Sequence, residues 1–255
     1  MNVVAIIQVR SASTRLPGKC MLKIFGKTIL EHIILRVSGA KKVQKICVAT
    51  TQNQEDDIIE RIVKKYNVAV YRGSESDVLD RFYQAAKLLQ ADIICRITAD
   101  DPFKDPLILD NFIDDFIAGG YDYLSNTIEP TYPEGIDIEV FNFCSLEKAW
   151  EEASLPSERE HVTPYIWKNS RKFNLYNKKH APDLSHLRWT LDKPEDWVFI
   201  QQVYDYLYSP ERIFHMADIL DLLKKHPDLL KINNKTIRNE GYLKSIKDDL
   251  CIERK

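Results

Sequence analysis

Residues 2–19 read NVVAIIQVRSASTRLPGK, an apolar run followed by a basic loop. Its apolar, β-branched beginning is typical of a buried parallel strand. The chain then enters a loop of small residues that carries three cations, Arg10, Arg15 and Lys19. Open α/β sheets bind their ligands at the carboxyl ends of the strands, so this loop predicts an anion site. The alternative is a solvated basic loop in which Ser and Thr only form turns.

Two familiar phosphate-binding motifs do not fit this loop. A Walker A loop needs a glycine five residues before its Gly-Lys pair and a Ser or Thr after the lysine, where this chain has Ser13 and Cys20. A Rossmann fingerprint needs glycines, and residues 8–17 contain none. The small residues Ser11, Ala12 and Ser13 still let backbone N–H groups approach a phosphate. We therefore expect side-chain charge, more than glycine backbone, to hold the phosphate.

Bulk composition narrows the class of protein. The 255 residues are 44% hydrophobic, which is enough for a packed core and argues against disorder. The formal net charge of −2 excludes a strongly basic nucleic-acid binder. The five cysteines form no CxxC pair, so each is expected to be a small buried hydrophobe in a reducing compartment. No stretch resembles a signal peptide or a membrane span, so we expect a cytoplasmic protein without membrane contact.

Strand and helix patterns alternate with short connections, which predicts a mostly parallel sheet with helices on both faces. After the first strand, further strands are predicted at residues 45–50, 68–71, 91–97, 121–125, 136–143, 173–177 and 186–190. Helices are predicted at residues 28–37, 55–66, 77–90, 106–118, 147–153 and 216–225, with another beginning at Pro194. Capping-box patterns mark two helix starts, Thr28 with Glu31 and Ser157 with Glu160.

Carboxylates occupy two loops that follow predicted strands. Asp100 and Asp101 come after the strand at 91–97, on the edge that also carries the basic loop. Oxygen ligands there suit Mg²⁺, which proteins usually hold with one or two carboxylates and substrate phosphates. We expect Asp100 to bind this metal and Asp101 to be a turn residue, with helix capping as the alternative. Asp192 is either a second metal ligand or the cap of the helix at Pro194, whose first turn also carries acidic residues that the helix dipole favours.

Two further segments offer polar side chains for a second ligand. The loop at 129–135 is rich in proline and aromatic residues, and it forms either a pocket wall or an ordinary hairpin connection. Arg159 and His161 lie near a predicted helix start and suit a carboxylate or a hydroxyl-rich ligand. A structural role is the alternative for His161, as it is for any lone histidine.

Together these motifs resemble the cytidylyltransferases that activate sugars, the CMP-Kdo synthetase and acylneuraminate cytidylyltransferase group. Within it they resemble most the spore coat polysaccharide biosynthesis cytidylyltransferase family. The run from Arg10 to Lys19 is similar to the triphosphate loop of the group. Residues 99–102 (ADDP) and 191–196 (LDKPED) resemble its two metal-carboxylate turns, and residues 133–137 (PEGID) and 157–163 (SEREHVT) resemble the narrower family. The resemblance spans roughly residues 3–245.

The resemblance implies a three-layer nucleotide-diphospho-sugar transferase fold. It implies a nucleotidyltransferase domain over residues 1–232 and a polar C-terminal arm over residues 233–255. The implied enzyme transfers CMP from CTP to a sugar, expected to be a 2-keto sugar acid, and releases pyrophosphate for surface polysaccharide or glycan biosynthesis. Mg²⁺ is the implied cofactor, and a cytoplasmic homodimer is the implied assembly.

The resemblance also suggests a role for individual residues. The stretch at 72–81 occupies the place where the group reads the cytosine. The residues expected to bind the nucleotide are Val9, Arg10, Ser11, Arg15, Lys19, Ser74 and Arg81. The residues expected to act in catalysis are Lys19, Asp100 and Arg10, and those expected to bind the metal are Asp100 and Asp192. The residues expected to bind the sugar are Glu134, Asp137, Arg159 and His161.

Three alternatives remain open from the sequence. The protein could use another NTP, it could be a metal-dependent glycosyltransferase of similar fold, or it could bind a nucleotide without catalysis. A glycosyltransferase usually carries Asp-x-Asp on its metal turn, whereas this turn reads Thr98-Ala99-Asp100-Asp101. A non-catalytic protein would not need both the cations and the carboxylates.

Overall fold

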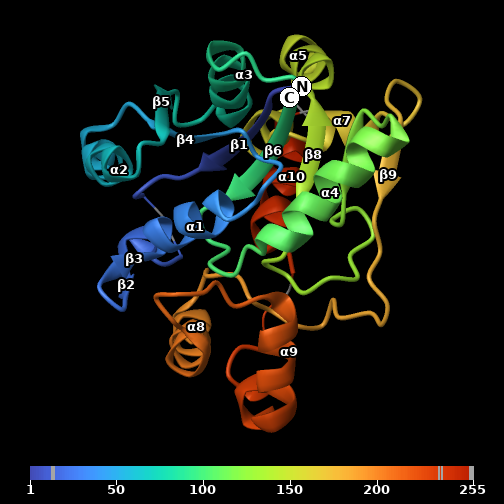
Figure 1. The fold of residues 1–255 in the computed structure, drawn as a ribbon. Helices are drawn as coiled ribbons and strands as arrows, with labels where there is room; N and C mark the ends of the chain where they lie inside the picture. The colour runs from blue at the N-terminus through green and yellow to red at the C-terminus, as the bar shows by residue number, and fades with distance from the viewer. Residues whose placement is uncertain (13–14, 235, 237, 253–255) are drawn as a thin grey trace.

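A seven-stranded sheet forms the centre of the computed structural model, which describes residues 1–12, 15–234, 236 and 238–252 (Figure 1). Ser13 and Thr14 of the basic loop lie outside the described residues. The strand order is β5-β4-β1-β6-β8-β7-β9. The strands are β1 (Val3–Gln8), β4 (Lys45–Thr51), β5 (Ala69–Gly73), β6 (Ile93–Thr98), β7 (Tyr123–Ser125), β8 (Glu139–Asn142) and β9 (Leu175–Asn177). A separate hairpin contains β2 (Lys23–Ile24) and β3 (Lys27–Thr28).

The mostly parallel sheet predicted from the sequence is confirmed. Strand β1 is parallel to both of its neighbours, β4 and β6, and β5 is parallel to β4. Strand β8 is antiparallel to β6 and β7, and β9 is parallel to β7. The chain first adds β4 and β5 on one side of β1 and later adds β6 on the other side. The strand order therefore reverses between β1 and β6, which is where open α/β sheets bind their ligands.

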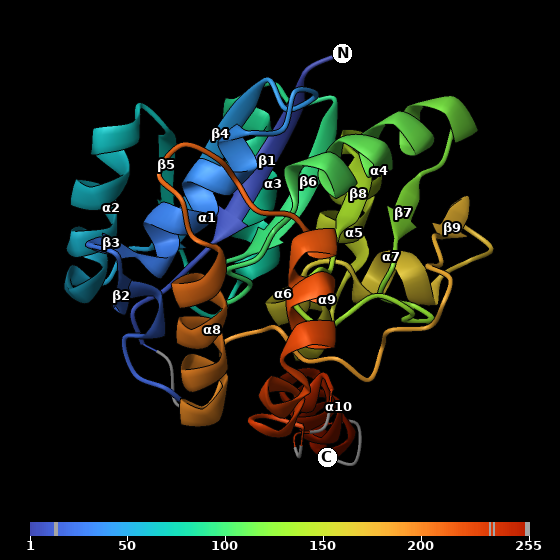
Figure 2. The same ribbon diagram turned by 60° about the horizontal axis from the view of Figure 1, so that its bottom comes forward.

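Helices cover both faces of the sheet, as predicted. On one face lie α1 (Ile29–Ser38), α2 (Asp57–Val63) and α4 (Pro106–Gly119). On the other lie α3 (Val78–Leu88), α5 (Phe143–Glu152), α6 (Pro156–His161) and α7 (Pro164–Lys168). Helices α8 (Pro194–Leu207) and α9 (Met216–Lys225) lie side by side below the sheet (Figure 2). Their apolar residues belong to the same hydrophobic cluster as those of α1, α2 and α4. Short 3₁₀ turns occur at Lys19–Met21, Gln54–Asp56, Lys64–Tyr66 and Pro227–Lys231.

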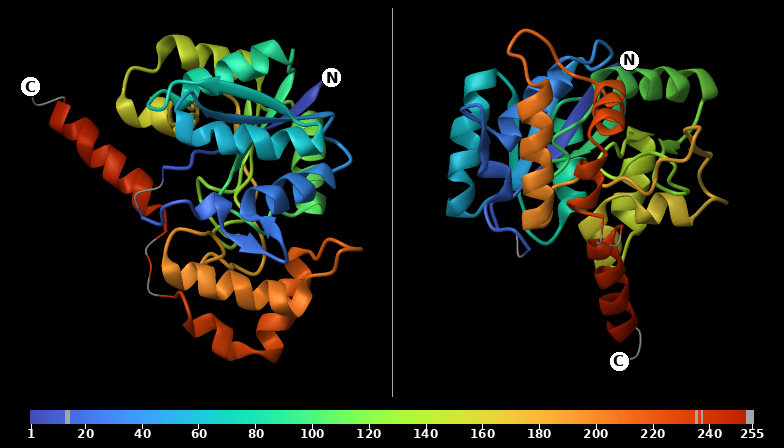
Figure 3. Two further views of the ribbon diagram at one scale, coloured as in Figure 1. Left: turned by 90° about the vertical axis from the view of Figure 1, so that its left-hand side faces the viewer. Right: turned by 90° about the horizontal axis from the view of Figure 1, so that it is seen from below.

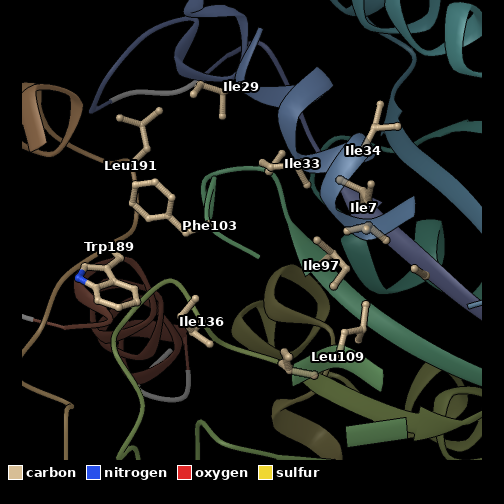
Figure 4. Close-up of a cluster of buried hydrophobic side chains, with 14 of the residues drawn as sticks. Ile7, Ile29, Ile33, Ile34, Ile97, Phe103, Leu109, Ile136, Trp189 and Leu191 are labelled. Atoms are coloured by element: carbon tan, nitrogen blue, oxygen red, sulfur yellow. The ribbon is translucent and has the colours of Figure 1, made fainter. Parts of the chain in front are cut away.

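The apolar run of β1 supplies both cores because successive side chains of a strand point to opposite faces. Val3, Ala5 and Ile7 belong to the larger cluster, and Val4 and Ile6 belong to the smaller one. Figure 4 shows part of the larger cluster, where isoleucines of α1 approach the loops that carry Phe103 and Trp189. Strand β1 is therefore buried on both faces, and the loop that follows it is anchored in the centre of the molecule.

Several local signals in the sequence are confirmed. The Thr28 side chain accepts from Glu31 N, and a Glu31 carboxylate oxygen accepts from Thr28 N at 2.7 Å, so the capping box of α1 is present. Helix α8 begins at Pro194, and α9 has the bounds predicted for it. These starts depend on residues within one turn of the helix, so the sequence contains all the information that they need.

The predicted capping box of Ser157 with Glu160 is wrong. Helix α6 begins earlier, at Pro156, and Leu155 is its N-cap residue. Glu158 supplies the acidic partner, because its Oε2 accepts from the Leu155 N–H at 3.3 Å. Proline is favoured at the first position of a helix, and the N-cap of α6 is therefore Leu155, two residues before the predicted Ser157.

Two other elements differ from the prediction. Helix α5 begins at Phe143 rather than near residue 147, because the Asn142 side chain caps it by accepting from Ser145 N at 2.7 Å. Residues 186–190 were predicted as a strand, but they make only an isolated bridge between Arg188 and Glu134.

The cysteines follow the prediction with one exception. Cys20, Cys47 and Cys95 are buried and unpaired. Cys144 is exposed, which contradicts the prediction, because it occupies the outer side of the first turn of α5. The side chain of Cys251 lies outside the described part of the chain.

The last helix, α10 (Glu240–Ile252), projects from the body of the molecule (Figure 3). It packs against α6, where Ser157 N donates to Asp249 Oδ1 at 3.0 Å and Ser245 Oγ donates to Glu160 Oε2 at 2.8 Å. Across the described ranges, no helix combines the length and the apolar character that crossing a bilayer requires.

Candidate active site

The basic loop meets both predicted metal carboxylates at one point. Lys19 Nζ lies 2.7 Å from Asp100 Oδ2 and 2.7 Å from Asp192 Oδ1. Arg15 Nη2 lies 2.9 Å from the same oxygen of Asp192. The loop after β1, the turn after β6 and the approach to α8 therefore converge. Asp192 does not cap α8, because Lys193 is the N-cap residue.

The Lys19 cluster consists of Lys19, Asp100 and Asp192, and its charges stabilise one another. Burial disfavours the charged form of Lys19, but the two carboxylates outweigh it and raise the lysine pKa. Burial also opposes ionisation of Asp100, yet the nearby ammonium lowers the pKa of Asp100 to about 2. Lys19 and Asp100 are therefore both ionised at neutral pH, and a positive charge lies between two acidic side chains.

This carboxylate pair suits Mg²⁺ that is shared with a substrate. In the described part of the chain, no group of three or more His, Cys, Asp or Glu could hold a metal ion by itself. Mg²⁺ is commonly bound by one or two carboxylates, with substrate phosphates and water completing its shell. The Lys19 ammonium lies where both carboxylates favour a cation. Asp100 and Asp192 therefore fit a metal site that phosphate oxygens complete.

Asp101 has a different environment from its neighbour Asp100. Its Oδ2 accepts from Thr98 Oγ1 at 2.7 Å and from Lys104 Nζ at 2.7 Å, and the ion pair is buried. Asp101 is therefore a structural residue of the turn, as the sequence predicted.

The other residues predicted to bind the nucleotide lie on the side of the basic loop that faces the loop after β5. Arg10 Nη1 lies 3.2 Å from Glu75 Oε1, and the arginine side chain is 43% exposed. Ser11 N donates to Asp56 Oδ1 at 2.8 Å, which fixes the beginning of the loop. Ser74 lies next to Glu75, and its hydroxyl accepts from Asp77 N at 3.2 Å. These contacts bring the loop after β1 and the loop after β5 together.

Val9 contributes to this region only through its main chain. Its side chain is buried in the larger core, and its N–H donates to Ala49 O at 3.1 Å. Val9 therefore holds the loop on the sheet.

Arg81 is a buried cation with unsatisfied hydrogen-bond donors. The residue is 2% exposed, and its Nε and Nη1 have no partner in the residues that the structure describes. Burial lowers the pKa of Arg81, and the neighbouring Arg10 lowers it further. Gly73 allows this placement, because a Cβ there would lie 2.8 Å from Arg81 Cγ. Buried donors without partners are costly, so Arg81 is suited to a ligand that brings acceptor oxygens.

A cavity of about 430 Å³ opens beside the Lys19 cluster. Arg15, Asp100 and Asp192 line one part of it. Of the residues predicted to bind the sugar, Glu134, Asp137 and His161 line the cavity. The loop at 129–135 thus contributes to a pocket wall through Glu134, which decides between the two interpretations of that loop.

Arg159, the remaining sugar candidate, is not among the residues that line this cavity. Its Nη2 lies 2.6 Å from Asp77 Oδ2, and its Nη1 donates to Trp150 O at 2.7 Å. These contacts connect α6 to the beginning of α3 and to α5. The geometry therefore gives Arg159 a structural role. His161 lines the cavity and also lies 3.0 Å from Ser245 Oγ of α10 through its Nε2.

The two acidic residues predicted to bind the sugar, Glu134 and Asp137, are each paired with an arginine. Arg188 Nη1 lies 2.7 Å from Glu134 Oε2, and Arg238 forms an ion pair with Asp137. Burial nevertheless raises the pKa of Glu134, and it raises the pKa of Asp137 to about 6. His161 is neutral at pH 7, because burial, together with the charge of Arg96, lowers its pKa to about 4.

The cavity wall contains an ion pair that the sequence did not predict. Arg96 of β6 pairs with Glu139 of β8. Glu139 also accepts from Tyr123 Oη at 2.6 Å and from Thr163 Oγ1. The available signal was a charged residue within each of the two predicted strands, Arg96 in 91–97 and Glu139 in 136–143, since a buried strand does not carry an unpaired charge. The C-terminal residues that line the cavity gave no such signal.

The fold and this site define a nucleotidyltransferase. The chain belongs to the cytidylyltransferase family, whose model, described as "Cytidylyltransferase", matches residues 4–233. The chain is 32% identical over 235 residues to the spore coat polysaccharide biosynthesis protein SpsF of Bacillus subtilis, covering 89% of this chain and 96% of that protein. It is 35% identical over 115 residues to a 3-deoxy-manno-octulosonate cytidylyltransferase of Geobacter sulfurreducens, covering 44% of each.

Solved structures agree with this assignment. A cytidylyltransferase from Leptospira borgpetersenii serovar Hardjo-bovis has a TM-score of 0.87 and 38% identity, and the match covers 94% of this chain and all of that one. CMP:2-keto-3-deoxy-manno-octonic acid synthetase, solved with CTP, has a TM-score of 0.61 and 17% identity, over 80% of this chain and 99% of that one. The second likeness shows the fold alone. Family membership makes the chain a nucleotidyltransferase, which removes the glycosyltransferase and the non-catalytic alternatives.

Proposed function

We propose that the protein transfers CMP from CTP to a 2-keto sugar acid and releases pyrophosphate, in the biosynthesis of a surface polysaccharide or glycan. The observation that carries the proposal is the Lys19 cluster, placed between the basic loop and the cavity. Relatives named for spore coat polysaccharide biosynthesis and for 3-deoxy-manno-octulosonate support the class of product. Membership of the cytidylyltransferase family supports the choice of nucleotide.

In the proposed reaction, an acceptor hydroxyl oxygen forms a bond to the α-phosphorus of CTP. The bond between this phosphorus and the bridging oxygen breaks, pyrophosphate leaves with the electron pair, and the hydroxyl proton passes to solvent. Charge repulsion is the main obstacle, so we expect catalysis through positioning and electrostatics. Arg10, Arg15 and Lys19 would hold the triphosphate and offset the charge on the departing pyrophosphate.

Asp100 and Asp192 would hold Mg²⁺ in this reaction. Bound there, the metal would neutralise phosphate charge and favour ionisation of the attacking hydroxyl. Lys19 would then leave the carboxylates and turn toward the phosphates, which a flexible ammonium side chain can do. Arg81 and Ser74 would face the cytosine side of the nucleotide, where the unsatisfied donors of Arg81 would gain acceptors. Glu134, Asp137 and His161 would contact the sugar.

The test measures pyrophosphate release for CTP, UTP, ATP and GTP in turn, each with Mg²⁺. The acceptors are 3-deoxy-manno-octulosonate, N-acetylneuraminate and, as a sugar without a carboxylate, N-acetylglucosamine 1-phosphate. We expect release only with CTP and a sugar acid, and none after EDTA is added. Release with another NTP would overturn the choice of nucleotide, and release only with the sugar phosphate would overturn the acceptor. No release with any pair would overturn the proposal.

We also propose that the protein is a cytoplasmic homodimer in which residues 233–255 form a polar C-terminal arm that follows the nucleotidyltransferase domain. Light scattering coupled to size-exclusion chromatography measures the assembly directly. The expected mass is twice the 29.7 kDa of one chain, and a mass of 29.7 kDa would contradict the dimer.

A further inference from the structure

The segment Arg238–Tyr242, called here the C-terminal wall, lies beyond the end of the family match at residue 233. Four of its residues line the cavity: Asn239, Glu240, Gly241 and Tyr242. The part of the chain that follows the family core thus reaches the place where the acceptor would bind.

Hydrogen bonds and ion pairs fix the C-terminal wall to the acidic side of the cavity. Arg238 forms an ion pair with Asp137, and its Nη1 donates to Tyr132 O at 3.0 Å. Asn239 N donates to Glu134 Oε1 at 3.1 Å. The wall therefore holds both acidic residues that were predicted to bind the sugar.

The same wall contacts the two segments that hold the phosphates and the metal carboxylates. Glu240 Oε2 lies 3.1 Å from Lys193 Nζ, next to Asp192. A Cβ on Gly241 would lie 3.5 Å from Arg15 Nη1, so the glycine backbone lies against that guanidinium. One short segment thus connects the sugar side of the cavity with its triphosphate side.

Tyr242 completes the wall on the side of α6 and α7. Its ring makes edge contacts with His161 at 5.1 Å and with Trp167 at 5.8 Å between centroids, and both residues also line the cavity. The Tyr242 hydroxyl oxygen is buried and has no hydrogen-bond partner within 3.5 Å in the described ranges, although the nearby Lys168 ammonium interacts with it. An acceptor rich in hydroxyl groups would supply a partner.

We propose that the C-terminal wall is a specificity-determining part of the acceptor site, and that Tyr242 contacts the sugar while Arg238 positions Asp137. This inference rests on the proposed function. The wall is assigned to the acceptor and not to the nucleotide, because most of its contacts are with Glu134, Asp137 and His161, the residues predicted to bind the sugar. The wall also forms one side of the cavity.

The test compares Tyr242→Phe, Tyr242→Ala, Arg238→Ala and Arg238→Lys with the wild-type chain. Lys247→Ala is the matched control, because Lys247 is an exposed residue of the same helix. The measurements are the KM for 3-deoxy-manno-octulosonate, or for the acceptor that the screen above identifies, the Kd for CTP and the melting temperature. We expect Tyr242→Ala and Arg238→Ala to raise the acceptor KM about tenfold with the Kd for CTP changed less than twofold.

The milder variants separate contact from folding. Tyr242→Phe keeps the ring and should raise the acceptor KM by about threefold, and Arg238→Lys should restore part of the loss in Arg238→Ala because it retains a cation for Asp137. An unchanged acceptor KM in the alanine variants, or equal losses for CTP and acceptor with a lower melting temperature, would overturn the wall as an acceptor element. If the wild-type chain releases no pyrophosphate with any acceptor, the proposed function fails and this inference fails with it.

Discussion

Lys19 connects the predicted triphosphate loop with both predicted metal ligands, so its replacement is the most direct test at the scale of one residue. We expect Lys19→Ala to lower kcat by about 10²–10³, which is typical when one electrostatic contact to a transition state is lost. The CTP-dependent rate of pyrophosphate release is the measurement. Lys23→Ala, an exposed lysine on the adjacent hairpin, is the control and should retain normal activity. Near-normal release by Lys19→Ala would contradict its role.

Replacing Arg81 should weaken CTP binding without lowering stability, whereas the replacement of most buried residues lowers stability. Replacing a buried, poorly satisfied cation with an apolar side chain of similar volume is often neutral or stabilising. We therefore expect Arg81→Met to keep or raise the melting temperature of the ligand-free protein while weakening CTP binding about tenfold. Calorimetry and thermal unfolding measure the two effects, with the exposed Arg61→Met as control. A large loss of stability with unchanged CTP affinity would make Arg81 a structural residue.

At the scale of the element, α8 begins with two carboxylates whose roles differ. Asp196 is buried, and it accepts from Arg188 Nε and Nη2 at 2.9 Å and from the N–H groups of Asp192 and Lys193 at 2.9 Å. Its neighbour Glu195 is exposed. The helix dipole alone would favour both residues about equally, and only burial distinguishes them.

We expect Asp196→Ala to lower the free energy of unfolding by about 3–5 kcal/mol, because it leaves Arg188 buried with unpaired donors. Glu195→Ala should cost about 0.3–1 kcal/mol through the helix dipole. Urea unfolding of the two variants measures the difference. Similar losses in both variants would show that the Arg188 network contributes little.

Some helices and strands were predictable from the sequence, and others were not. The starts of α1, α8 and α9 were predicted correctly, because the residues that cap each helix lie within one turn of its start. The predicted strand at 186–190 failed for the opposite reason. Its apolar residues are buried, but Arg188 is held by Glu134 and Asp196, and no alternation of side chains within the segment reports these distant partners.

Some residues of the candidate site were likewise identifiable from the sequence, and others were not. The basic loop, Asp100 and Asp192 were identifiable, because each follows a recognisable strand or precedes a recognisable helix. Arg159 was assigned to the sugar from its residue type, and its actual partner, Asp77, is distant in the sequence. The C-terminal wall could not be predicted, since its role depends on where the end of the chain returns to the sheet.

At the scale of the whole molecule, two partly buried groups give opposite contributions to stability as the pH falls. The pKa of His161 is lowered to about 4, so between pH 6.5 and 4 the unfolded chain binds a proton that the folded chain does not, and stability falls with acidification. The pKa of Asp137 is raised to about 6, so in the range from pH 6 to pH 4 the folded chain binds the extra proton and stability rises. The two effects partly cancel in the wild-type protein.

Replacing one of the two groups should therefore reveal the contribution of the other group to the pH dependence of stability. We expect His161→Gln to remove a loss of about 1–3 kcal/mol between pH 7 and pH 4 relative to wild type, because glutamine does not titrate. Urea midpoints at several pH values measure this difference. Arg96, Glu139, Glu160 and Asp249 influence His161 and are present in both proteins, so the comparison isolates the histidine. Parallel pH curves for the two proteins would contradict the depressed pKa.

The contact of Gly241 with Arg15 joins two parts of the chain that leave the ribosome far apart in time. The strands around β1 can assemble while the last residues are still being synthesised, since domains begin to fold from the N-terminal side. The cavity, however, lacks one of its sides until residue 242 has emerged. A chain that ends before this segment would therefore retain the strands of the sheet and lack one side of the cavity.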